Sequence, residues 1–429
     1  MVGTSGVRRA DVAVAAGKIV AVGPSLAVTS RESLDASGLT IFPGVIDSHV
    51  HFNEPGRTEW EGIATGSSAV AAGGGTMFFD MPLNAHPPTL DAESFRRKRA
   101  AAEARSLVDF ALWGGLTPLN LERMPELAQC GVIGFKAFMA NSGMDDFPLA
   151  DDATLRAGMK RAAALKRLVA VHAESEAMTS RRSGSKIRDY LNSRPIEAEL
   201  EAISRALEFA GETGCALHIV HVSSARGVHL VAEAHARGVD ATCETCPHYL
   251  HLTDKDVERL GAVAKCAPPL RSATEQTLLR ACLAAGQIAT VGSDHSPSPP
   301  GMKTDLNFFN VWGGIAGAQH LLPLMITLGL EPPALARLLS HNVARRFDLP
   351  EAKGQIAVGA DADLALVDLN ADFEVRTGDL LYRHKQSPYV GRRLRGAVRR
   401  TLVRGKTVFR DGRIIGPPGG RLITPPGVC

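Results

Sequence analysis

The sequence predicts an α/β protein in which a (β/α)8 TIM barrel is joined to a small β-sandwich domain formed by both termini. Between residues 42 and 349, short apolar and β-branched runs alternate with stretches rich in Ala, Leu, Glu and Arg, which is typical of βα units. In residues 1–41 and 350–429, apolar and polar residues alternate around glycine-containing turns, which favours antiparallel hairpins. We therefore expect a barrel domain over 42–349 and a discontinuous small domain over 1–41 and 350–429.

Eight apolar runs within the central region are the expected barrel strands. They read IFPGVIDSHVHF, GTMFFDMP, DFALWGG, VIGFKAFM, RLVAVHAE, ALHIVHVSS, DATCETCPHYL and QIATVGSDHSP. Each run is followed by a polar turn and usually by a helical stretch, such as residues 195–214. Because a closed parallel barrel places its active site at the carboxyl ends of its strands, residues that end these runs are the candidates for chemistry.

Composition and charge exclude several classes of protein. A formal charge of +3 over 429 residues, with no run of five basic residues, argues against a nucleic-acid partner. No stretch of roughly 18 apolar residues could span a bilayer, and the first residues lack the apolar core of a signal peptide. Seven cysteines without regular spacing indicate free thiols in a reducing compartment. We therefore expect a cytoplasmic protein without a membrane partner.

Two histidines stand at the end of the first expected strand. His49 and His51 are two residues apart, so the alternation of a strand turns both imidazoles to the same face, here the barrel interior. Such a pair alone is more often a packing feature than a pair of ligands. Its meaning depends on what ends the other strands.

Three more side chains of metal-ligand type end other strands. They are His172, His221 and Asp294, at the ends of the fifth, sixth and eighth runs. Each by itself could be a satisfied core histidine or a helix-capping aspartate. Five such residues at one end of a barrel are hard to obtain from packing alone, so together they predict a metal site.

A lysine ends the fourth run. A charged Lys136 pointing into a barrel among apolar neighbours would be costly, unless it reaches solvent or forms an ion pair. Addition of CO2 would instead make the amine an anionic carboxylated lysine able to bridge two metal ions. Four histidines, one aspartate and this bridge suit two divalent ions. Zn2+ is favoured, and Co, Mn and Fe stay open.

These motifs resemble the cyclic amidohydrolases of the amidohydrolase superfamily, which comprise dihydroorotases, hydantoinases or dihydropyrimidinases, and allantoinases. The likeness covers nearly the whole chain and includes PGVIDSHVHFNEPG, GFKAFM, VHAES, HVSSARG, ETCPHYL, KCAPPLR and GSDHSP. It implies that the metal ligands are His49, His51, carboxylated Lys136, His172, His221 and Asp294. It also implies a homo-oligomer, by analogy a homotetramer.

Within this group the chain is most similar to allantoinases, on the segments EPGRTEWEG, DMPLN, NSGMDDFP and NFFNVWGGIAG. Asn53 stands where dihydroorotases carry an arginine for the substrate carboxylate, although Arg57 lies close by in sequence. Asn141 stands where hydantoinases carry a tyrosine. Allantoin is therefore the leading substrate. The alternatives are a hydantoinase or dihydropyrimidinase, then a dihydroorotase, and outside the enzymes a metal-free scaffold protein.

The resemblance implies a hydrolase acting on the C–N bond of a small cyclic ureide. A metal-bridging hydroxide would attack the ring amide, with Asp294 as general base, to give allantoate from allantoin. Asn141 or a backbone N–H would stabilise the oxyanion. Asn84 and His248 would either contact the substrate or have a structural role. Glu54 would either support His51 or cap the following turn.

Overall fold

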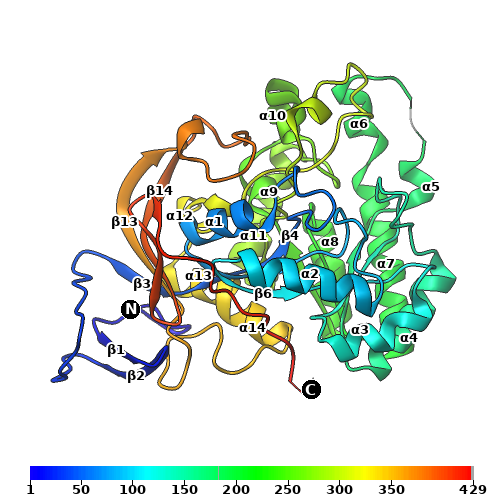
Figure 1. The fold of residues 1–429 in the computed structure, drawn as a ribbon. Coiled ribbons are helices and arrows are strands. Elements are labelled where there is room, and N and C mark those ends of the chain that lie inside the picture. The colour runs from blue at the N-terminus through cyan, green and yellow to red at the C-terminus, as the bar shows by residue number, and fades with distance from the viewer. Residues whose placement is uncertain (182, 427–429) are drawn as a thin grey trace.

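The computed structural model describes residues 1–181 and 183–426 of the chain. Two parts are seen in Figure 1: a barrel surrounded by helices and a set of antiparallel strands at one side that contains residues from both ends of the chain. Within the described residues, no helix is both long and apolar enough to cross a membrane.

The barrel strands follow the eight apolar runs of the sequence. They are β4 (Val45–Val50), β5 (Gly75–Asp80), β6 (Asp109–Leu112), β8 (Phe135–Phe138), β9 (Val169–His172), β10 (Leu217–Ile219), β11 (Ala241–Thr245) and β12 (Thr290–Val291). Neighbouring strands pair in parallel, and the short β7 (Gly114–Gly115) continues the path of β6 and pairs with β8. A parallel bridge between Val50 and His295 closes the ring, which confirms the predicted (β/α)8 fold.

Helices cover the outside of the barrel in Figure 1. Their bounds are α1 (Ile63–Ala72), α2 (Ala92–Arg105), α3 (Met124–Cys130), α4 (Asp152–Ala164), α5 (Glu176–Thr179), α6 (Ile187–Ser193), α7 (Ile196–Thr213), α8 (Ala225–Ala236), α9 (Pro247–His251), α10 (Asp254–Leu260), α11 (Ala273–Ala284), α12 (Leu321–Thr327), α13 (Pro332–Ala336) and α14 (Asn342–Arg346). The longest, α7, buries one apolar stripe and ends at Gly214, whose φ of 67° is a left-handed conformation that glycine adopts easily.

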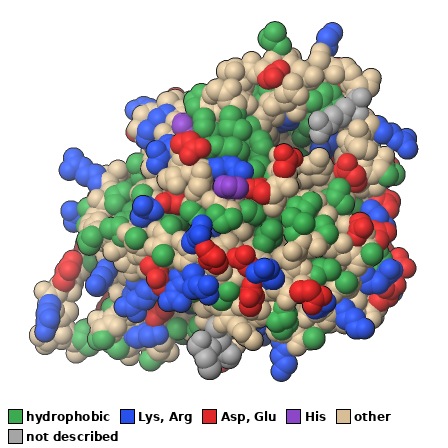
Figure 2. All heavy atoms as spheres, turned by 45° about the vertical axis from the view of Figure 1, so that its right-hand side comes forward, with side chains coloured by type: hydrophobic (Ala, Val, Ile, Leu, Met, Phe, Trp, Pro, Cys, Tyr) green, Lys and Arg blue, Asp and Glu red, His purple; other side chains and the backbone are tan. Residues whose placement is uncertain are grey.

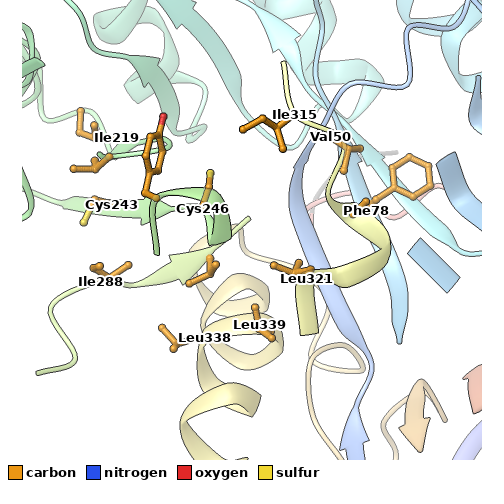
Figure 3. Close-up of a cluster of buried hydrophobic side chains, with 14 of the residues drawn as sticks. Val50, Phe78, Ile219, Cys243, Cys246, Ile288, Ile315, Leu321, Leu338 and Leu339 are labelled. Atoms are coloured by element: carbon orange, nitrogen blue, oxygen red, sulfur yellow. The ribbon is translucent and has the colours of Figure 1, made fainter. Parts of the chain in front are cut away.

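The main hydrophobic core lies between the strands and these helices. Figure 3 shows part of it, where Val50 and Phe78 from the strands lie near Leu321 and Leu339 from the outer segments. Cys243 and other cysteines of the described chain are free and mostly buried in this apolar packing. The CxxC sequence at 243–246 is therefore part of the core.

The antiparallel strands form two sheets. One is the hairpin of β1 (Asp11–Ala15) and β2 (Lys18–Gly23); the other has the order β16 (Arg413–Ile414), β15 (Lys406–Arg410), β14 (Arg393–Val403), β13 (Leu364–Glu374) and β3 (Thr40–Pro43). Ile19 of the hairpin packs with Leu364 and Leu366 of the larger sheet in a small core of its own. Both termini thus contribute to one small domain, as the sequence predicts.

Parts of the carboxyl-terminal segment pack on the barrel and not on the small domain. The N–H of Ile423 donates to the carbonyl of Phe110 in β6 at 2.8 Å, and the Arg383 Nε donates to the carbonyl of Glu61 at 2.6 Å. The boundaries between the two domains at 41/42 and 349/350 stay predictions. Strand β3, at 40–43, crosses the first of them and pairs with β13 of the small domain.

A buried ion cluster joins the two parts. The Lys353 Nζ lies 2.6 Å from Asp109 of β6, 2.8 Å from Asp361 and 2.7 Å from Asp363. Burial disfavours the charged form of Lys353, but these carboxylates hold the pKa of Lys353 above its usual value. The three aspartates lie close enough together to hold a cation, and the ammonium of Lys353 supplies that charge.

Candidate metal centre and active-site cavity

Three of the expected ligands meet at the carboxyl ends of β4 and β12. The Nε2 atoms of His49 and His51 lie 3.3 Å and 3.5 Å from Asp294 Oδ1. Strand alternation turns both imidazoles inward, and Asp294 reaches them from the loop after β12. Their donor atoms lie within 4.8 Å of one another, a spacing that could hold a metal ion.

The other two histidines lie beside this group. His172 Nδ1 is 3.1 Å from His221 Nε2, and the rings of His49 and His221 are 5.4 Å apart between centroids. Burial lowers the pKa values of His51, His172 and His221, so that these imidazoles are neutral near pH 7. Neutral imidazole is the form that binds a metal.

Lys136 lies at the same end of the barrel, in β8. Its side chain has no exposed area, and its Nζ has no hydrogen-bond partner within the described chain. The amine lies over the ring face of Phe138, 5.0 Å from the centroid, so neither a lysine reaching solvent nor a close ion pair describes it. Burial lowers the pKa of Lys136 to about 7, so a large fraction of the amine is uncharged and nucleophilic near neutral pH.

Several residues around the centre have left-handed backbone conformations that non-glycine residues rarely adopt. His221 has φ 41° and Asp294 φ 46°, while Asn53 and Asn84 have φ 63° and 67°. Such conformations persist only when the surrounding structure imposes them, and they concentrate at functional sites. Of these four, His221, Asp294 and Asn84 line one cavity, whereas Asn53 does not.

Two buried carboxylates that sequence reasoning missed hold the histidine rings. Glu244 Oε1 lies 2.9 Å from His49 Nδ1, and Glu174 Oε2 lies 2.7 Å from His172 Nε2 and 2.6 Å from Arg194. Although burial opposes ionisation, His218 and His49 hold the pKa of Glu244 well below its usual range, and Arg194 and His172 do the same for Glu174. A glutamate within an apolar strand, as in ETCPHY, was the available signal.

A cavity of 440 Å³ opens directly above these residues. The five histidine and aspartate candidates line it, together with Asn84, Asn141 and Arg194. The segment 309–314, which follows the loop after β12 in the chain, also lines it. This volume is in the range of small-molecule sites.

The expected substrate contacts do not behave alike. Asn84 lines the cavity, with its Nδ2 3.5 Å from His51 Nδ1. Asn141 also lines it, and because its Oδ1 accepts from the Gly143 N–H at 2.7 Å, its amide NH2 is the group left to face a ligand. His248 differs from the expectation, since it is fully buried beside Asp294 and is not among the residues lining the cavity.

The contacts of Glu54 and Arg57 indicate the roles of these two residues. Glu54 accepts from the Ile63 N–H at 2.9 Å, so it caps α1 and does not support His51. Arg57 donates to the carbonyl of Asn84 at 3.1 Å and pairs with Asp146 at 3.2 Å. Arg57 does not line the cavity, so it does not take the place of the arginine that dihydroorotases carry.

Charge is mixed over the surface of the molecule. Figure 2 shows acidic and basic side chains side by side over this face, with hydrophobic atoms scattered between them. No single sign dominates the face in view.

Comparison with known proteins agrees with this geometry. A model of the amidohydrolase family matches residues 40–408. Allantoinase from Rubrobacter xylanophilus is 57% identical over 428 residues, covering 97% of this chain and 94% of that protein. Allantoinase from Deinococcus radiodurans is 52% identical over 438 residues, covering 99% of this chain and 97% of that protein.

Solved structures give the same answer for the fold. L-Hydantoinase (dihydropyrimidinase) from Arthrobacter aurescens aligns with a TM-score of 0.96 at 34% identity, covering 99% of this chain and 97% of that one. Dihydropyrimidinase from Brevibacillus agri aligns with a TM-score of 0.91 at 29% identity, covering 98% and 96%. The chain therefore belongs to the amidohydrolase family.

Proposed function

We propose that this protein hydrolyses the ring amide bond of allantoin to give allantoate, a step of ureide and purine catabolism, at a binuclear metal centre. The observation that carries the proposal is that four histidines and Asp294 line a 440 Å³ cavity, while the amine of Lys136, at the same end of the barrel, is buried without a partner among the described residues. The assignment of allantoin as substrate rests on two relatives that are allantoinases, at 57% and 52% identity.

The residues fit a pair of divalent ions. His49, His51, His172, His221 and Asp294 would be the protein ligands, and a carboxylated Lys136 would be shared between the ions. The Nζ of Lys136 and the Nδ1 of His221 are both buried without a partner in the described chain, which is the condition expected of ligand atoms. Nitrogen and carboxylate donors favour Zn2+, with Co, Mn or Fe as alternatives.

When bound, such ions lower the pKa of a water molecule and polarise the amide carbonyl. Side chains of the protein would transfer the proton and hold the substrate. Although burial opposes ionisation, His49 and His51 hold the pKa of Asp294 well below its usual value, so it is a carboxylate at neutral pH. Asp294 would accept a proton from the attacking water and deliver it to the leaving ring nitrogen. The NH2 of Asn141 would donate to the developing oxyanion, and Asn84 would hold the ring.

A second candidate is hydrolysis of hydantoin or dihydrouracil, favoured by the structural likeness to L-hydantoinase at a TM-score of 0.96. The deciding experiment measures turnover of racemic allantoin, hydantoin, dihydrouracil and dihydroorotate by metal-reconstituted protein. A clear preference for allantoin supports the proposal. Opening of another ring with allantoin inert would transfer the substrate assignment to that ring, and no turnover at full metal occupancy would reject the substrate class.

We further propose a homotetramer working in the cytoplasm. The tetramer rests on the family resemblance, and the free, mostly buried cysteines support a reducing compartment. Light scattering coupled to size exclusion measures the subunit number directly.

A further inference from the structure

One part of the lining of the cavity is a loop without regular secondary structure. Residues 308–314, FFNVWGG, form it, and six of these seven residues line the cavity. A segment of this kind has no ladder of backbone hydrogen bonds to fix its shape. Its carbonyl groups must find other donors wherever they are buried.

Two lysine ammonium groups supply those donors. Lys265 Nζ lies 2.6 Å from the carbonyl oxygen of Phe308, 3.2 Å from that of Phe309 and 2.5 Å from that of Val311. The Nζ of Lys303 lies 2.9 Å from the carbonyl oxygens of both Trp312 and Gly314. Five of the seven carbonyls in the segment are therefore held by two cations.

The surroundings of Lys265 suit a structural or positioning role. Its side chain is 4% exposed, and its ammonium lies 4.5 Å from the ring centroid of Tyr190 and 5.2 Å from that of Phe308. Its own carbonyl accepts from the Gly314 N–H at 2.7 Å. The lysine thus ties α6, the segment around 265 and the loop into one wall.

We propose that Lys265 and Lys303 are positioning residues that fix the conformation of loop 308–314 and thereby set the affinity and selectivity for the ring substrate. This inference rests on the proposed function, because it assigns the loop as the wall that contacts a cyclic ureide. Lys265 itself lines the cavity, and the two ammonium groups occupy five carbonyl oxygens of the loop that would otherwise be open to other donors. Both ammonium groups are engaged by the loop carbonyls, so binding and not the chemical step depends on them.

The test replaces Lys265 by methionine, which keeps the length of the side chain and removes its charge and donors. We expect KM for allantoin to rise at least about tenfold while kcat stays within about threefold, since the lost interaction is a binding one. The preference for allantoin over hydantoin should narrow in the same variant. Lys255→Met, at an exposed position of α10, is the matched control and should behave as the wild type.

Hydrogen–deuterium exchange of the peptide that covers 306–316 measures, without any substrate, how firmly the two lysines fix the loop. We expect faster exchange of this peptide in Lys265→Met, with the peptides of β4 and β9 unchanged. Lys303→Met should show the same pattern, and it carries the test should Lys265→Met fail to fold. Unchanged exchange of the loop with unchanged KM overturns the proposal, as does a loss of kcat with unchanged KM. Should the wild type open no ureide ring, the proposed function fails while the exchange data still decide whether the lysines hold the loop.

Discussion

Nδ1 of His49 lies 2.9 Å from Oε1 of Glu244, so a carboxylate of β11 holds a histidine of β4 across the barrel. Both side chains are about 1% exposed. Such a partner fixes the tautomer and the orientation of a metal-binding imidazole, which leaves Nε2 toward Asp294.

Replacing Glu244 by glutamine should therefore weaken metal binding. The amide keeps the shape of the side chain but loses its charge, and we expect metal affinity to fall about 10- to 100-fold. Metal content after dialysis against a weak chelator measures this, together with the metal concentration needed to restore activity. Glu233→Gln, exposed on α8, is the control. Equal metal retention by Glu244→Gln and the wild type would contradict the role.

Replacing Lys136 by alanine should abolish stable metal occupancy and turnover. The physical reason is that its amine is buried and unpartnered within the described chain, at the same end of the barrel as the histidines and Asp294. Short carboxylic acids should restore part of the activity by supplying the missing carboxylate. Undiminished metal content and activity in Lys136→Ala, measured by elemental analysis and allantoin hydrolysis, would reject the carboxylated lysine.

Replacing Asp294 by asparagine should remove the base. A positioned general base typically contributes 10²- to 10⁴-fold to the rate, so we expect kcat to fall by about that factor or more. KM should change less, because the amide occupies the same space. Steady-state kinetics at matched metal content separates this from metal loss. A variant with wild-type kcat would mean that another group takes the proton.

Replacing Arg57 by methionine should loosen the segment that carries Asn84. The guanidinium joins the carbonyls of Asn84 and Ala85 to Asp146, which belongs to the loop after β8. We expect KM for allantoin to rise about tenfold, equivalent to about 1.4 kcal/mol. Dihydroorotate should be a poor substrate of both proteins, because Arg57 is already occupied. Selective loss of activity toward dihydroorotate would instead show that Arg57 binds its carboxylate.

Replacing Lys353 by methionine should destabilise the junction between barrel and small domain. The change removes the cation shared by Asp109, Asp361 and Asp363, although Arg404 still pairs with Asp109 and Lys18 with Asp361. Removing one partner of a buried ion pair typically costs about 3–5 kcal/mol. Asp363 loses its ion-pair partner among the described residues, which favours its protonation, so the folded variant takes up a proton at higher pH than the unfolded chain. The loss of stability should therefore shrink as pH falls from 8 to 5.

Denaturant unfolding at both pH values measures this effect. The double variant Lys353→Met with Asp363→Asn should recover part of the stability at pH 8, since it removes one of the crowded charges. A loss in the single variant that does not change with pH would assign the effect to packing alone.

The sequence by itself determined the barrel and the group of residues expected at its centre. Period-two and βα patterns identify eight strands, and a closed parallel barrel necessarily brings their carboxyl ends together. For that reason the strand pattern alone predicts that His49, His172, His221 and Asp294 converge, although they lie up to 245 residues apart, and the fold does bring them together.

Only the tertiary structure decided what surrounds that centre. Three contacts depend on side-chain directions in segments that are distant in sequence. Glu244 contacts His49, Arg57 contacts the carbonyl of Asn84 outside the cavity lining, and His248 lies buried beside Asp294. The contacts between Lys265 and the carbonyls of an irregular loop produce no periodic pattern in the sequence. Local patterns specify elements and their ends, whereas these contacts follow from how the elements pack, which no short stretch of sequence encodes.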